Sequence, residues 1–301
     1  RHWEFDMTMI FGVPLVVLTG QVMIGLINGS FYALLSLGLA VIFGLLRVVN
    51  FAHGAFYMLG AFAAWMLGQY LGLGYWPSLL LAPVLVGLVG ALVERTMLRR
   101  LYDLDHLYGL LFTFGLALLL EGAFQHFYGA SGKPFSTPAE MRGVIRTDFV
   151  TVPIYRGWVV VASLLICFGT WALIEKTKIG SYLRAATEDA TLVQAFGVNV
   201  PLLLTLTYAF GCALAGVAGV LAAPIFQVSP TMGSNMIIII FAVVVVGGMG
   251  SILGAIATGY LLGVVEGLTK VFYPEAANIV IFVIMAIVLI LRPAGLFGKE
   301  N

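Results

Sequence analysis

The chain has 301 residues, of which 61% are hydrophobic and only 10% are charged, with a formal net charge of +1. Soluble domains are about 45–50% apolar and about 25% charged, so this composition excludes a soluble protein. The near-zero charge, the two cysteines and the 36 glycines without a period also exclude nucleic-acid-binding, disulfide-scaffold and collagen-like classes. The mean hydropathy of +1.06 indicates a protein of the lipid bilayer.

Apolar segments long enough to cross a membrane recur along the chain, since a spanning helix needs about 20 mainly apolar residues. Candidate spans lie at residues 9–28, 30–46, 51–72, 77–98, 108–128, 157–175, 202–224, 252–270 and 276–292. The shorter run Met236–Val246 would rise only about 16 Å as a helix. It is expected to be re-entrant, discontinuous or the first part of a broken span. We therefore predict an all-α fold: a polytopic transmembrane helical bundle of eight to ten spans, one domain over residues 1–301, with a broken or re-entrant segment near 235–250.

Two short loops, within residues 94–105 and 176–200, are rich in arginine and lysine. Cytoplasmic loops carry an excess of these residues, so both loops are expected inside the cell. The loop at residues 129–156 lies between them and is expected outside. Counting spans outward places both ends of the chain inside if Met236–Val246 crosses the membrane, and the C-terminal end outside if this run only dips in. Arg292 and Lys299 favour the inside.

Small residues recur at four-residue spacing within four of the candidate spans. The rows are Gly25, Gly29 and Ala33; Gly60, Ala64 and Gly68; Gly211, Ala215 and Gly219; and Gly259, Gly263 and Gly267. Such rows let helix backbones approach closely in lipid. The same seams are also candidates for sliding during a transport cycle.

The stretch Arg47–Phe62 places a polar residue, Asn50, between two apolar runs. Its side chain is predicted to cap a helix that starts at Phe51, with His53 in the first turn. Polar, broken segments between helices are also where transporters build binding sites or gates. The two interpretations are compatible.

The segment Gly180–Val200 has the pattern of a short amphipathic helix. Leu183 and Val193 belong to its apolar face, and Arg184 and Glu188 lie at i,i+4 on another face. Such a helix either lies at the membrane interface or docks into a groove of a partner protein.

The short apolar run ends in the string Gly247–Ser251, which cannot stay regularly helical without a free-energy cost. Backbone groups freed by such a break must lie against protein or a water-lined cavity. The segment is therefore either a re-entrant hairpin packed for structural reasons or the wall of a translocation path.

Two glutamates fall at or near membrane depth, where ionisable groups are costly. Glu266 is expected to pair with Lys270 at i,i+4, and Glu121 is expected near a helix end or in a structural pairing. The four histidines show no metal-ligand spacing, and the chain has neither a nucleophile–base pattern nor a phosphate-binding GxxxxGK[ST] loop. We predict no enzyme activity, no catalytic or metal-binding residue and no cofactor bound by this chain, which cannot hydrolyse ATP itself.

Several ordered motifs together resemble the permease subunits of branched-chain amino acid ABC importers. They are GLINGSFYALLSLGLAVIFGL (25–45), RVVNFAHGAFYMLGAF (47–62), LRAATEDATLVQAFGVN (183–199), GGMGSILGA (247–255), LLGVVEGL (261–268) and LRPAGLFG (291–298). The resemblance covers nearly the whole chain except the loop at residues 129–156.

The resemblance implies a permease that spans the cytoplasmic (inner) membrane many times and moves branched-chain or related neutral amino acids by alternating access. Its partners would be ATPase subunits that use the ATP, a second homologous permease chain or a copy of itself, and an external substrate-binding protein. Residues 176–200 would form the coupling-helix loop, whose role we assign to Arg184, Glu188, Asp189 and Gly197. The translocation-path candidates are Asn50, Phe51, His53, Gly54, Gly247, Gly248 and Gly250. Because a binding protein would select the substrate, no residue pair that clamps a zwitterion is expected.

The general ABC-importer loop places a glycine about six residues after a Glu-Ala-Ala sequence. Here Asp189 follows Glu188 and Gly197 is nine residues further on, which resembles this family's own version of the loop.

Three alternatives remain open on the sequence. Similar permeases handle urea or short amides, and an ion-coupled secondary transporter would share the composition and the broken helices. An intramembrane enzyme would need several catalytic groups that converge on one site, and His53 with Asn50 alone does not provide them.

Overall fold

The computed structural model describes residues 9–10, 12–46, 48–102, 104–147 and 151–298, which are mostly helical. Its α-helices are α1 (Leu15–Leu46), α2 (His53–Leu71), α3 (Tyr75–Thr96), α4 (His106–Tyr128), α5 (Ile154–Lys176), α6 (Lys178–Glu188), α7 (Ala190–Ala195), α8 (Val200–Phe226), α9 (Met232–Gly247), α10 (Ile252–Phe272) and α11 (Val280–Leu291). Short 3₁₀ turns lie at Leu98–Leu101 (η1), Ala139–Met141 (η2) and Pro274–Ala276 (η3).

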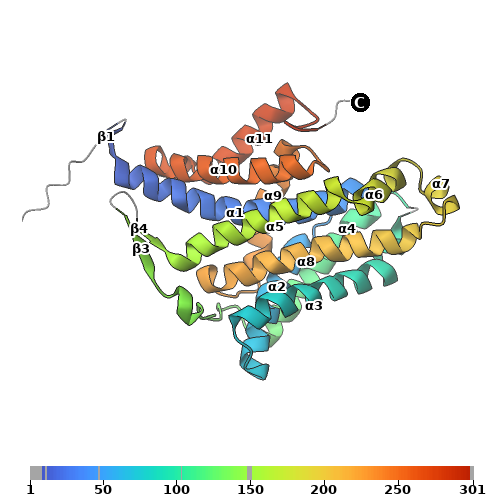
Figure 1. Cartoon of the computed structure of the whole chain (residues 1–301), viewed down its shortest axis with the longest axis horizontal. Coiled ribbons are helices and arrows are strands. Elements are labelled where there is room, and N and C mark those ends of the chain that lie inside the picture. The colour runs from blue at the N-terminus through green and yellow to red at the C-terminus, as the bar shows by residue number, and fades with distance from the viewer. Residues whose placement is uncertain (1–8, 11, 47, 103, 148–150, 299–301) are drawn as a thin grey trace, which may run out of the picture.

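Two small antiparallel strand pairs complete the fold. They are β1 (Met9–Ile10) with β2 (Val13–Pro14), and β3 (Val144–Arg146) with β4 (Thr151–Pro153). Both pairs lie at one end of the helical bundle, which we call the hairpin end, whereas α6 and α7 lie at the opposite end, the α6–α7 end (Figure 1). The long helices α1, α3, α5 and α8 run between these two ends.

Within the described residues, six helical segments are long and apolar enough to cross a membrane: Leu15–Gly44, Tyr75–Leu101, His106–Tyr128, Ile154–Lys176, Val200–Phe226 and Ile252–Phe272. The helices α9 and α11 are apolar but shorter. The all-α polytopic architecture is therefore confirmed, while the expected eight to ten spans are not. The predicted break near residues 235–250 is present, because α9 ends at Gly247 and α10 begins at Ile252.

The prediction of separate spans at residues 9–28 and 30–46 is wrong, because α1 is one continuous helix of 32 residues. The hydroxyl of Ser30 donates to the Leu26 carbonyl within the helix at 2.9 Å, so this polar position needs no turn. Gly29 lies against the backbone of Tyr260 in α10, where a Cβ atom would come within 3.0 Å. These small residues make a packing face rather than a loop.

Because the two predicted spans form the single helix α1, the first helix of the bundle begins at a different end than expected. The start of α1 lies at the hairpin end, next to β1 (Figure 1). The expectation that the N-terminal end of the bundle shares a side with residues 176–200 is therefore wrong. The segment after α11 does share that side, because Phe297 and Gly298 line the same cavity as Arg184.

Rows of small residues form close helix contacts, as predicted. The α1 row packs on the α10 row, where a Cβ on Gly263 would lie 2.5 Å from the Gly25 carbonyl oxygen. Helices α2 and α8 also approach closely through their rows, since a Cβ on Gly219 would lie 3.1 Å from the carbonyl carbon of Gly60. Close backbone approach of this kind is how membrane helices associate.

The two buried glutamates of the described residues, Glu94 and Glu266, both accept hydrogen bonds. Glu266 accepts from Lys270 Nζ at 2.5 Å, as the spacing predicted, and from the Tyr32 hydroxyl at 2.6 Å. Glu121, on α4, is half-buried, and the structure gives it no hydrogen bond or ion pair with another described residue.

Glu94, near the end of α3, is fully buried. Its carboxylate accepts from the Tyr102 hydroxyl at 2.9 Å and from Thr205 Oγ1 at 2.5 Å. Burial and the neighbouring Glu94 carboxylate raise the pKa of the Tyr102 hydroxyl well above its usual range, so it stays protonated as a donor. These contacts join the basic loop after α3 to the start of α8.

Substituting Tyr102→Phe should lower the thermal unfolding midpoint of the purified protein. The substitution removes one donor from a buried carboxylate, which costs about 1–3 kcal/mol. Tyr108→Phe is the matched control, since Tyr108 is 56% exposed. Equal midpoints for the two variants would show that the Tyr102–Glu94 hydrogen bond contributes nothing to stability.

Candidate functional site

An open cavity of about 500 Å³ lies at the α6–α7 end. Its walls are the end of α1, the junction of α5 with α6, the turn between α9 and α10, and the residues after α11. The cavity thus brings together two regions that the sequence analysis singled out separately, the coupling loop through Arg184 and the glycine-rich turn through Gly250.

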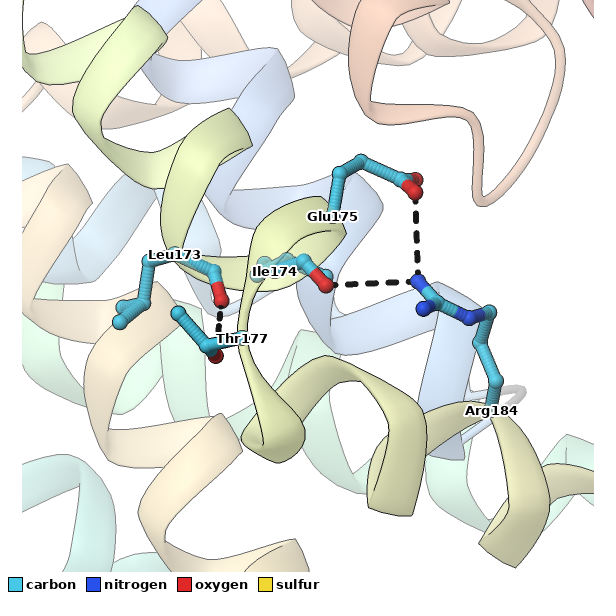
Figure 2. A network of polar contacts seen from close by, with 5 residues as sticks. All are labelled: Leu173, Ile174, Glu175, Thr177 and Arg184. Atoms are coloured by element: carbon cyan, nitrogen blue, oxygen red, sulfur yellow. Dashed lines mark hydrogen bonds and ion pairs between the residues drawn. The ribbon is translucent and has the colours of Figure 1, made fainter.

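The junction of α5 with α6 is a sharp elbow made by a single residue. Helix α5 ends at Lys176, α6 begins at Lys178, and Thr177 between them is extended, with φ −115° and ψ 164°. The Thr177 hydroxyl donates back to the Leu173 carbonyl at 2.5 Å (Figure 2). The chain therefore turns without a flexible loop.

The elbow is closed by contacts between α6 and the last turn of α5. Gly180 lies so close to Ile174 that a Cβ atom would fall 1.5 Å from the Ile174 carbonyl oxygen. Arg184 Nη1 donates to that same oxygen and to Glu175 Oε2, each at 3.3 Å (Figure 2). The position of α6 is consequently tied to the end of α5.

Two of the predicted coupling residues shape the backbone. Asp189 caps α7, because its Oδ1 accepts the Leu192 backbone N–H at 2.9 Å. Gly197 has φ +84°, a left-handed conformation that favours glycine, and it ends the turn after α7. Glu188, by contrast, is the exposed last residue of α6.

The α6–α7 segment also leaves apolar side chains uncovered. Leu183 and Val193 are buried as the amphipathic pattern predicted. Four large apolar residues point outward instead, with exposed fractions of 49% for Ile179, 44% for Tyr182, 55% for Leu192 and 80% for Phe196. We call these four residues the apolar cap. Its apolar residues were visible in the sequence, but their exposure depends on the direction in which α6 leaves the elbow.

The glycine-rich turn is held by the residues that follow α11. Gly248 and Gly250 have φ values of +98° and +84°, so the backbone there requires glycine. The backbone N–H of Leu296 donates to the Val246 carbonyl at 2.8 Å, and that of Phe297 donates to the Gly247 carbonyl at 3.2 Å. These bonds satisfy carbonyls at the end of α9 that have no partner within the helix.

The segment around Asn50 starts α2 deep in the bundle, two residues later than predicted. Helix α2 begins at His53, and Asn50 Oδ1 accepts the Ala52 backbone N–H at 3.1 Å. This bond closes a turn before the helix. The prediction that Asn50 caps the helix is wrong, because the N-cap residue is Ala52 and α2 has no side-chain capping bond. His53 Nε2 lies 3.0 Å from the Leu35 carbonyl oxygen of α1, and Gly54 lies against the backbone of Gly233 in α9.

Aromatic packing fixes the same segment from two sides. The ring of Phe51 lies 4.7 Å from the Phe241 ring of α9 and 6.0 Å from the Phe114 ring of α4, centroid to centroid. One buried nitrogen of this segment, His53 Nδ1, has no hydrogen-bond partner among the described residues.

The structure therefore separates the predicted path residues into two groups. Gly250 lines the cavity at the α6–α7 end. The other predicted path residues do not, namely Asn50, Phe51, His53, Gly54, Gly247 and Gly248. Glu175, which faces Arg184, was missed, because an acidic residue nine positions earlier gives no spacing signal. Among the described residues, no group of three or more histidine, cysteine, aspartate or glutamate side chains could hold a metal ion.

Comparisons with known proteins agree on one family. The family model described as branched-chain amino acid transport system, permease component, matches residues 21–289. No solved structure gives a significant match.

Curated relatives cover nearly the whole chain. The high-affinity branched-chain amino acid transport system permease protein BraD of Pseudomonas aeruginosa is 31% identical over 93% of this chain and 96% of its own length. LivH of Escherichia coli K12, a permease protein of the same description, is 27% identical with the same coverage. LivM of that organism is 27% identical over 94% of this chain and 71% of its own length. The chain is therefore a multi-pass membrane protein that belongs to the branched-chain amino acid transport system permease family.

Proposed function

We propose that this chain is the membrane-spanning subunit of an ATP-driven importer for branched-chain or related neutral amino acids in the cytoplasmic membrane. The α6–α7 end would face the cytoplasm, because the basic loop after α3 and the basic residues around α6 both lie there. The hairpin end, with residues 129–156, would face outward and receive substrate from a binding protein.

The apolar cap is the observation that carries this proposal. Phe196 is 80% exposed at an end of the molecule that is otherwise rich in arginine and lysine, and we infer that it faces a partner protein rather than lipid. Exposed apolar patches on a water-facing surface mark sites of protein association. The chain has no phosphate-binding loop of its own. An ATPase subunit docked on α6 and α7 would both cover this surface and supply the energy.

The elbow between α5 and α6 would link a docked ATPase subunit to the membrane-spanning helices. Movement of α6 would be transmitted to α5 through the Gly180–Ile174 contact and the bonds of Arg184. The same cavity separates α6 from the turn between α9 and α10, which leaves room for displacement. Rigid-body motion of packed helices is one of the established ways to open a site alternately to each side.

A second permease chain would complete the importer. Escherichia coli K12 has two similar proteins with separate names, LivH and LivM, and both align with this chain over more than nine-tenths of its length. This supports pairing with a homologous chain or with a second copy.

Reconstitution in proteoliposomes tests the proposal. Leucine uptake should require ATP, the ATPase subunits and a binding protein, and should be indifferent to a proton or sodium gradient. Accumulation by the purified chain alone, without ATP, would contradict the proposal and favour a secondary transporter.

The apolar cap makes a separate prediction. Phe196→Asp should reduce co-purification of the ATPase subunits at least tenfold, because it places a charge at the centre of an apolar contact. Insertion of the chain into the membrane should be unchanged. Ile145→Asp is the control, since Ile145 is 55% exposed on β3 at the opposite end. If Phe196→Asp and Ile145→Asp retain the ATPase subunits equally well, α6 and α7 are not the docking surface.

A further inference from the structure

The cavity at the α6–α7 end contains a pair of opposite charges. Arg184 Nη1 and Glu175 Oε2 are 3.3 Å apart, and both residues line the cavity. Their side chains are 50% and 45% exposed, respectively. An ion pair this exposed is held weakly, because solvent screens the attraction. Either charge can therefore exchange its partner for a ligand group.

The remaining hydrogen-bonding capacity of the pair suits a zwitterion. Both described bonds of Arg184 come from Nη1, whereas a guanidinium has five N–H donors in a planar fork that fits a carboxylate. Glu175 is acceptor-only when ionised and suits an ammonium group. A ligand carrying a carboxylate and an ammonium on one carbon presents both charges within the reach of this pair.

The rest of the cavity is mainly apolar. Val41, Leu183, Ile252 and Leu253 contribute aliphatic side chains, and Phe297 contributes an aromatic one. The volume of about 500 Å³ falls within the range of small-molecule sites, about 300–1,000 Å³. The lining thus combines one charged edge with an apolar wall that suits an aliphatic side chain.

We propose that this cavity binds a zwitterionic amino acid with an aliphatic side chain, through Arg184 to its carboxylate and Glu175 to its ammonium group. The proposal rests on the proposed function and departs from the expectation that no residue pair clamps a zwitterion. It makes the cavity the final binding site before release at the α6–α7 end. A bound ligand would separate Arg184 from Glu175, and would thereby loosen one of the bonds that ties α6 to α5.

Equilibrium binding of radiolabelled leucine tests the site directly. The purified chain is placed in nanodiscs of phosphatidylglycerol and phosphatidylcholine, which contain no primary ammonium. Glu175→Gln and Arg184→Gln should each weaken leucine binding at least tenfold. Arg100→Gln, at an exposed position of the other basic loop, should leave binding unchanged.

Two leucine analogues assign each charge separately. Isocaproate lacks the ammonium group, so its binding should be insensitive to Glu175→Gln and reduced by Arg184→Gln. Isoamylamine lacks the carboxylate and should show the opposite pattern. Equal sensitivity of both analogues to both variants would overturn the assignment, since it would indicate a general loss of structure.

Other outcomes separate this proposal from the proposed function. If the importer takes up leucine with ATP but the variants bind leucine normally, the cavity site is wrong and the proposed function stands. If wild-type chain binds leucine as described but ATP never drives uptake, the proposed function fails instead. Loss of leucine binding on adding phosphatidylethanolamine, with no effect of phosphatidylcholine, would overturn the proposal by showing that a lipid headgroup fills the cavity.

Discussion

Gly219→Leu is expected to abolish the accumulation of folded protein. A Cβ atom on Gly219 would lie 2.2 Å from the Tyr57 carbonyl oxygen and 2.7 Å from the Ala61 backbone nitrogen, at the crossing of α2 and α8. Both contacts are backbone atoms, which cannot rotate away as a side chain can. Overpacking a core costs about 1–3 kcal/mol and occasionally more, and here the two helices must separate along their length. Size-exclusion chromatography of the detergent-solubilised variant should show loss of the monodisperse peak.

The control for this prediction adds the same side chain where space is open. Gly115 lies on α4, and a Cβ atom there would meet nothing within 4 Å. Gly115→Leu should elute as the wild type does. A normal elution profile for Gly219→Leu as well would mean that α2 and α8 do not cross as closely as described.

The second large effect is expected from Gly180→Ala, which should leave the helical bundle folded but reduce ATP-driven uptake at least tenfold. The added methyl would overlap the Ile174 carbonyl oxygen, only 1.5 Å from the new Cβ atom. Helix α6 must then swing away from the end of α5, and the Arg184 bonds to Ile174 and Glu175 are lost with it. Uptake and ATP turnover are measured together in proteoliposomes, since uncoupling lowers the first relative to the second.

Gly169→Ala is the matched control because it adds the same methyl on α5, where a Cβ atom meets nothing within 4 Å. Uptake by this variant should equal that of the wild type. Wild-type uptake by Gly180→Ala would show that the elbow does not transmit movement.

The close contacts between helices could be predicted from the sequence, because rows of small residues in membrane helices are typical of helix–helix interfaces. The number of spans could not be predicted. The Asn28–Ser30 triplet resembles a turn between two spans, yet the Ser30 hydroxyl is satisfied inside α1 and Gly29 faces α10. Whether a small polar residue ends a helix or packs against another depends on the neighbouring helix, which local sequence does not contain.

The candidate site was only partly predictable for the same reason. Arg184 and Gly250 stand in recognisable motifs, but the cavity they share exists because distant segments meet there. The partnership of Arg184 with Glu175 depends on the angle of a one-residue elbow. Similarly, the sequence predicted a polar turn at Asn50, but the helix after it begins at His53 with Ala52 as its N-cap.

The bonds from Leu296 and Phe297 to the last carbonyls of α9 impose an order on biogenesis. Those carbonyls are made some fifty residues before their donors leave the ribosome, and in lipid an unsatisfied carbonyl is costly. During translation, the carbonyls at the end of α9 must therefore stay without their final partners for a time. Water, the insertion machinery or a neighbouring helix must satisfy or shield them until then. The synthesis of Leu296 and Phe297 is therefore the step that lets these carbonyls be satisfied.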